Sequence, residues 1–527
     1  MPSKSNHLWP ELLIPLLCIA PSVAVGLHGL NRPYDAIPDQ DMLWASEALR
    51  LIRGAAPSYA DHPGAFWPLI YSLDIQVLQT FKGQSLLDEA GSILPNSISA
   101  LIQVARIQHA CITGCCAALI QPVSQLLGTR RNLAIASSLI ASFSSAILVA
   151  ASEIRHEVVS ALFFLLYILC AGQSLKPTQD RTRALTLNGL SVLFFFLAAF
   201  AKQQVLLCTP LALIAIASAG YSARPADLNT RLQTLLKLSP SRQFVLVIAA
   251  AAPWLIAASP DIDLINLPAW LLINGGLAFS LSLVAEAPAD RQQLLRPLLL
   301  LGGLEIVLFR ILAPGWWSQA VTGFPSWMFR HASPTADRLG QTLAGANTYF
   351  TSLFTPHSMA AAALAGITVI SLLAAAVQRK GETGLQRARI TTRAATWLGI
   401  LFTVAACSQR VTPRYQIYIF IPILLAAAAT ISATKPTNSF SETSQPDQLI
   451  SVSSRALASV LLITALISST LNVTRLESFV AADQPEHFIC FGQHMDAAMR
   501  LTSAGACSNF HEAASDKRKY DGWRGPR

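Results

Sequence analysis

Apolar residues run along most of the chain in long uninterrupted stretches. Stretches of about twenty apolar residues match the length that a helix needs to cross a hydrocarbon core of ~30 Å. Strands of a transmembrane barrel would alternate polar and apolar residues, and these stretches do not. The pattern predicts an all-α polytopic membrane protein with about thirteen transmembrane helices. The expected spans are 10–28, 98–120, 132–151, 157–173, 186–201, 203–220, 243–259, 267–285, 294–313, 358–378, 394–408, 415–432 and 455–473.

The first span, 10–28, is expected to remain as an uncleaved helix, because no small-x-small cleavage site precedes a polar segment and many spans follow it. The weakest division between spans is at Lys202, which with two glutamines forms the only polar break before 203–220. With the N-terminus inside, about nineteen Lys and Arg fall in cytoplasmic segments and about eleven in outer segments before the tail. This bias predicts a multi-pass protein of the plasma (inner) membrane with a cytoplasmic N-terminus.

The expected domain organisation follows from these spans. Residues 1–473 would form one transmembrane domain with two long outer loops, 29–97 and 314–357. Residues 434–454 begin with a polar, Ser/Thr-rich stretch that is typical of a flexible cytoplasmic linker. Residues 474–527 would form an extracytoplasmic C-terminal tail.

The first outer loop carries a helical pattern directly after an acidic stretch. Trp44, Ala48 and Leu51 fall on one helical stripe, whereas Glu47 lies toward the other side with two arginines. This predicts an amphipathic helix in the membrane interface. A second apolar-faced segment follows it in the same loop.

Composition agrees with a membrane protein. Only 13% of the 527 residues are charged, 53% are hydrophobic and the mean hydropathy is +0.46, whereas soluble domains carry about 25% charged residues. The formal net charge of +9 is explained by Lys and Arg in cytoplasmic loops, so no nucleic-acid partner is expected.

Ionisable residues near membrane depth cost several kcal/mol and are functional candidates for that reason. In the predicted topology these residues gather on the outer side, at the ends of spans or in outer loops. They are Asp39, Asp41, Asp61, His62, Glu153, Arg155, His156, Glu157, Lys202, Arg410 and Arg414. Charges on the inner side are plain Lys and Arg anchors. A one-sided cluster beside long outer loops predicts a site at the outer interface.

Asp39 and Asp41 precede the interfacial helix. Two neighbouring carboxylates are suited to removing a proton from an acceptor hydroxyl or to binding a divalent metal. Alternatively, they complement the dipole of the helix that follows. No other cofactor is expected.

Arg155 and Lys202 are candidates for binding a phosphate. A guanidinium can donate two parallel hydrogen bonds to a phosphate. The alternative for Arg155 is local pairing with Glu153 and Glu157. Lys202 must snorkel, pair or meet an anion. Arg410 and Arg414 would anchor a span at the outer face or form a second phosphate clamp.

The order of motifs resembles the GT-C glycosyltransferase superfamily, near its protein O-mannosyltransferase and aminoarabinose-transferase branch. The resemblance rests on an acidic motif in the first outer loop (Asp39-Gln40-Asp41), the turn Asp61-His62-Pro63-Gly64, Arg155 with Glu157, FLAAFAKQQ and PRYQIYIFIPILL. It covers residues 10–220 well and 395–432 weakly. The sequence departs from the branch in having Asp-Gln-Asp for Asp-Glu, and Asp61-His62-Pro63 where a Lys-Pro-Pro element is usual.

The resemblance implies an inverting transfer of a hexose or pentose from a polyprenyl-phosphate or polyprenyl-diphosphate donor to a lipid, glycan or protein acceptor at the extracytoplasmic face of the cell envelope. By the same resemblance Asp41 or Asp39 would be the base. Arg155, Lys202, Arg414 and Arg410 would bind the donor phosphate, and Asp61, His62 and Glu157 would contact substrate. A divalent metal on Asp39 and Asp41 remains open.

Two other functions use similar features. A lipid-linked sugar transporter or flippase would explain many spans, but it predicts charges near the bilayer midplane and inverted repeats, and we see neither in the sequence. A polysaccharide polymerase or ligase would share the outer site and rely on a late outer loop rich in Arg and His. Arg330, His331, Arg338 and His357 keep that alternative open.

Overall fold

The computed structural model describes residues 8–30, 41–52, 66–83, 85, 95–126, 129, 131–152, 154–174, 181–202 and 425. Within these ranges the regular structure is entirely helical. The predicted spans beyond Lys202, the late outer loop and the C-terminal tail lie outside the described residues. The described residues therefore do not test the expected number of about thirteen spans.

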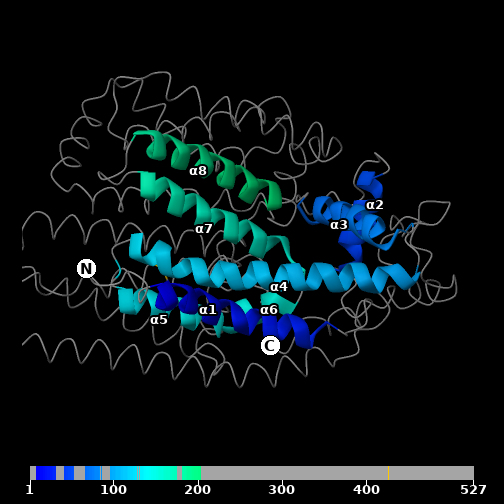
Figure 1. Cartoon of the computed structure of the whole chain (residues 1–527), viewed down its shortest axis with the longest axis horizontal. Helices are drawn as coiled ribbons and strands as arrows, with labels where there is room; N and C mark the ends of the chain where they lie inside the picture. Colours follow the sequence, from blue (N-terminus) through cyan, green and yellow to red (C-terminus); the bar gives the residue numbers. More distant parts are fainter. Residues whose placement is uncertain are drawn as a thin grey trace, which may run out of the picture.

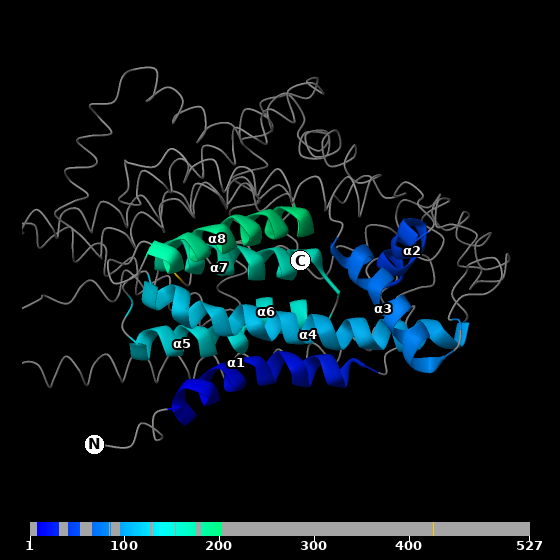
Figure 2. The same cartoon turned by 45° about the horizontal axis from the view of Figure 1, so that its top comes forward.

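Six helices run side by side (Figures 1 and 2). They are α1 (Leu8–His28), α4 (Pro95–Leu126), α5 (Arg131–Ser142), α6 (Ser145–Ser152), α7 (His156–Ser174) and α8 (Arg181–Ala201). α7 packs most extensively on α8 and α4, and α1 packs on α4. Two shorter helices, α2 (Asp41–Ile52) and α3 (Phe66–Lys82), pack on each other at one end of this bundle.

Several apolar runs form helices close to their predicted bounds. α1, α7 and α8 match the expected spans 10–28, 157–173 and 186–201, and α8 ends at the predicted break before Lys202. Among the described residues, α7 is the one helix long and apolar enough by itself to cross a membrane, and α1 holds a shorter apolar stretch, Leu13–His28.

The expected single span 132–151 is wrong in one respect, because α5 and α6 are separate helices. The break falls in a serine-rich stretch, and serine hydroxyls compete for backbone hydrogen bonds. Ser144 caps α6: its Oγ accepts a hydrogen bond from the Ile147 N–H at 3.3 Å and donates one to the Ala141 carbonyl at 2.7 Å. These contacts stabilise the end of one helix and the start of the next.

Small residues bring α1 close to α4. A Cβ at Gly114 would lie 2.8 Å from the Ile19 Cα, and a Cβ at Gly26 would overlap that of Ala110. Small residues at helix interfaces allow this approach and gain van der Waals contact. At the same interface the Arg106 guanidinium donates hydrogen bonds to the carbonyls of Gly29 and Leu30 at 3.3 and 3.4 Å. These bonds give hydrogen-bond partners to carbonyl groups just after the end of α1.

α4 is longer than a bilayer requires. Its 32 residues extend over about 48 Å, compared with a hydrocarbon core of ~30 Å. Leu101, Ile102 and Ala105 from its first half join the buried cluster that α2 and α3 form around Trp44 and Trp67. The first half of α4 therefore positions the two short helices at the end of the bundle.

Candidate functional site at one end of the bundle

Buried polar side chains collect at the end of the bundle where α2 and α3 pack. They come from α2, α3, the first half of α4, the connection between α6 and α7, the start of α7 and the residue that follows α8. They are Glu47, Asp74, Arg106, His109, Arg155, His156, Glu157 and Lys202, each 9% exposed or less. At the opposite end, Arg131 and Arg183 are exposed. Of the residues predicted to gather on the outer side, the four with described side chains, Arg155, His156, Glu157 and Lys202, lie at this end of the bundle.

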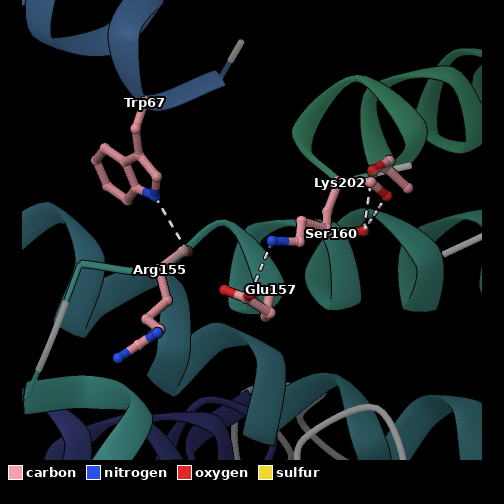
Figure 3. Close-up of polar contacts among 6 residues, drawn as sticks. Trp67, Arg155, Glu157, Ser160 and Lys202 are labelled. Carbon is pink, nitrogen blue, oxygen red and sulfur yellow. Dashed lines mark hydrogen bonds and ion pairs between the residues drawn. The ribbon is translucent and has the colours of Figure 1, made fainter. Parts of the chain in front are cut away.

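A buried ion pair joins the start of α7 to the end of α8. The Lys202 Nζ lies 3.0 Å from the Glu157 Oε1, and the two side chains are 2% and 5% exposed (Figure 3). Lys202 was expected to snorkel, to pair or to meet an anion, and in the structure it pairs with Glu157. Charges withdrawn from water attract each other strongly but also lose solvation, so such a pair fixes geometry more than it adds stability.

Arg155 lies in the short connection between α6 and α7. Its carbonyl accepts a hydrogen bond from the Trp67 Nε1 at 3.1 Å, which ties the connection to α3. Figure 3 shows its guanidinium directed away from the ammonium of Lys202, with the Glu157 carboxylate between them in this view. In this view the two cations lie on different sides of the Glu157 carboxylate.

His156 is enclosed by this cluster. Its ring meets the Trp44 ring edge-on, with centroids 4.2 Å apart. Among the described residues, neither ring nitrogen has a hydrogen-bond partner. The contact links α2 directly to the first residue of α7, and Trp44 lies about one helical turn along α2 from Asp41.

Asp74 on α3 faces α4. Its Oδ1 accepts a hydrogen bond from the Gln108 Nε2 at 2.9 Å, while its Oδ2 has no partner among the described residues. Burial raises the pKa of the Asp74 carboxyl, and the hydrogen bond from Gln108 opposes that shift. Asp74 therefore joins α3 to α4.

Asp74→Asn is expected to stabilise the protein at neutral pH. A carboxyl whose pKa is raised by folding stabilises the fold below its unfolded pKa, and that contribution is lost as pH rises through the folded pKa. The amide removes the charge and keeps an acceptor for Gln108. Thermal unfolding in detergent should show a higher Tm for the variant at pH 7, with the gain disappearing below about pH 4. An equal gain at both pH values would contradict this account.

The structure places only some of the predicted site residues. Arg155, Glu157 and Lys202 are described in full, whereas Asp41 is described as the first residue of α2 without its side chain. Asp39, Asp61, His62, Glu153, Arg410 and Arg414 lie outside the described residues. In the described part of the chain, no group of three His, Cys, Asp or Glu side chains is arranged to hold a metal ion.

The prediction for Glu47 is wrong. The sequence pattern placed it on the outward side of the interfacial helix, but it is 1% exposed. The reason is that α2 packs against both α3 and α4, so more than one stripe of the helix is covered. Trp44, Ala45, Ala48 and Leu49 are buried beside it.

Sequence reasoning also missed His109 and Asp74. His109 lies in the middle of the span 98–120, and its Nε2 is 2.8 Å from the Ala150 carbonyl. Asp74 interrupts an otherwise apolar segment of the first outer loop. An ionisable residue within an apolar run was the available signal for both.

The described part of the chain is a helical bundle with buried polar groups at one end. No protein-family model matches the chain, and no curated protein matches its sequence. Among solved structures, it is similar to the archaeal oligosaccharyltransferase AglB from Archaeoglobus fulgidus in complex with an inhibitory peptide and a dolichol-phosphate. The identity is 12% and the TM-score 0.43, over 89% of this chain and 56% of that one. The chain thus spans about half the length of that protein, and its activity has to be derived from its own residues.

Proposed function

We propose that the chain is a membrane glycosyltransferase that moves a sugar from a polyprenyl-phosphate-linked donor to an acceptor hydroxyl at the extracytoplasmic face. The observation that carries the proposal is the gathering of buried Arg155, Glu157 and Lys202 at the end of the bundle where α2 begins with Asp41. Cations held in a site without water are suited to stabilising the charge of a departing phosphate.

We assign Arg155 and Lys202 to the phosphate of the donor, because a guanidinium and an ammonium form charge-assisted hydrogen bonds with phosphate oxygens. A doubly charged phosphate would require more cations, and we assign this role to Arg410 and Arg414. The hydrocarbon chain of such a donor would lie between membrane helices, which accounts for a transferase built into the bilayer.

The proposed base is Asp41 or Asp39, at the start of α2. The carboxylate would accept the proton of the acceptor hydroxyl as its oxygen attacks the anomeric carbon, while the bond from that carbon to the phosphate oxygen breaks. Attack opposite the leaving phosphate inverts the anomeric centre. Asp61 and His62, in the segment between α2 and α3, are proposed to contact the sugar or acceptor.

A reconstitution assay tests this function against transport. Liposomes containing the purified chain would receive radiolabelled polyprenyl-phosphate hexoses and pentoses together with a crude extract of envelope lipids and glycans. We expect label to move to an acceptor with release of free polyprenyl phosphate. Movement of the intact donor between leaflets, without cleavage of its sugar–phosphate bond, would instead identify a flippase and contradict the proposal.

A further inference from the structure

Two residues near the start of α7 hold the end of α8. Glu157 and Ser160 are spaced to lie on the same face of a helix. The Glu157 Oε1 is 3.0 Å from the Lys202 Nζ, and the Ser160 Oγ donates a hydrogen bond to the Ala198 carbonyl at 2.9 Å (Figure 3). The Ser160 Oγ also lies 3.4 Å from the Lys202 carbonyl. One face of α7 thus contacts both the backbone and the side chain of Lys202.

The contacts from Glu157 and Ser160 order Lys202, which would otherwise be mobile for two reasons. A residue that follows the end of a helix tends to fray, and a lysine ammonium is carried on a flexible four-carbon stem. Lys202 is nevertheless 1% exposed, and its N–H donates a hydrogen bond to the Ala198 carbonyl at 2.9 Å. The Ala198 carbonyl therefore accepts hydrogen bonds from both Ser160 and Lys202, which connects the two contacts.

We infer that Glu157 is a positioning residue, which with Ser160 fixes the Lys202 ammonium at the donor-phosphate site and does not itself contact substrate. The inference rests on the proposed function. It changes the role that the sequence resemblance gave to Glu157. The Glu157 carboxylate has the same sign of charge as a phosphate and lies 3.0 Å from the Lys202 ammonium, so its effect on a phosphate passes through the cation that it orients.

Changing the lengths of the two paired side chains tests the positioning role without removing a buried charge. Glu157→Asp shortens the acid by one methylene group, and Lys202→Arg lengthens the base. We expect Glu157→Asp alone to lower kcat for transfer by about 10–100-fold, with a smaller change in the donor KM, because a displacement of about 1 Å is costly in a transition state. In the double variant, kcat should return to within about twofold of Lys202→Arg alone.

The assay uses the full chain in liposomes and the radiolabelled polyprenyl-phosphate sugars. If the losses of Glu157→Asp and Lys202→Arg multiply in the double variant, Glu157 acts independently of Lys202 and the positioning role is overturned. The same conclusion follows if Glu157→Asp raises the donor KM without lowering kcat. Absence of transfer by the wild-type chain would instead remove the proposed function and the positioning role together.

Ser160→Ala examines the backbone half of the contact. It should lower kcat, whereas Ser137→Ala should leave kcat unchanged. Ser137 is a matched control because its buried hydroxyl donates to the Leu133 carbonyl of its own helix, α5, at 2.8 Å. Equal kcat values for the Ser160→Ala variant and wild type would show that the hydroxyl does not help to position Lys202.

Discussion

Glu157→Gln should lower the free energy of unfolding by about 3–5 kcal/mol, because it leaves the Lys202 ammonium buried without its counterion. The partner side chains are 2% and 5% exposed, so solvent screens this pair much less than a surface pair. Replacing both partners by Glu157→Gln and Lys202→Met should cost less than the single change, because neither charge then remains buried.

Chemical unfolding in mixed micelles would measure both free energies. Thr186→Val is a suitable control on α8, since its hydroxyl is exposed and bonds the Thr182 carbonyl of the same helix at 3.0 Å. The control should stay within about 0.5 kcal/mol of wild type. A loss below about 1 kcal/mol for Glu157→Gln would mean that the pair behaves as a solvated one.

Asp39→Asn combined with Asp41→Asn should reduce kcat by about 10²–10⁴-fold, the usual contribution of general base catalysis. The amide has the shape of the carboxylate but cannot accept the acceptor proton at neutral pH. The donor KM should change little, because the phosphate is held by the cations. Transfer kinetics in liposomes would measure this, and the single variants would identify which carboxylate is the base.

Asp74→Asn is the matched control for this experiment, since it makes the same chemical change on the adjacent helix α3. It should retain transfer, while the double variant should unfold at the wild-type temperature. Full activity in the double variant would show that neither Asp39 nor Asp41 is the base. An equal loss of kcat in Asp74→Asn would show that the effect comes from a general change in charge at this end of the bundle.

Parts of this architecture could be predicted because they depend on local sequence. The lengths of apolar runs located α1, α7 and α8, and the polar break at Lys202 marked the end of α8. The prediction that the charges share one side of the membrane came from counting spans, because each span reverses the direction of the chain. These features do not require knowledge of how helices rotate about their axes.

Features that depend on packing could not be predicted in the same way. The pairing of Glu157 with Lys202 joins α7 to α8, and it requires the relative rotation of the two helices. Glu47 was placed outward because a helical stripe cannot show that α2 has neighbours on two sides. The break between α5 and α6 had a signal in its serines, but length and hydropathy favoured one span.

The position of this polar end relative to the membrane is the central claim, and reporter fusions test it most directly. Alkaline phosphatase joined after His62, between α2 and α3, should be active because that segment is predicted to be extracytoplasmic. The same enzyme joined after Thr178, between α7 and α8, should be inactive, because α7 leads away from the polar end. Activity after Thr178 and none after His62 would place the site in the cytoplasm and contradict the account.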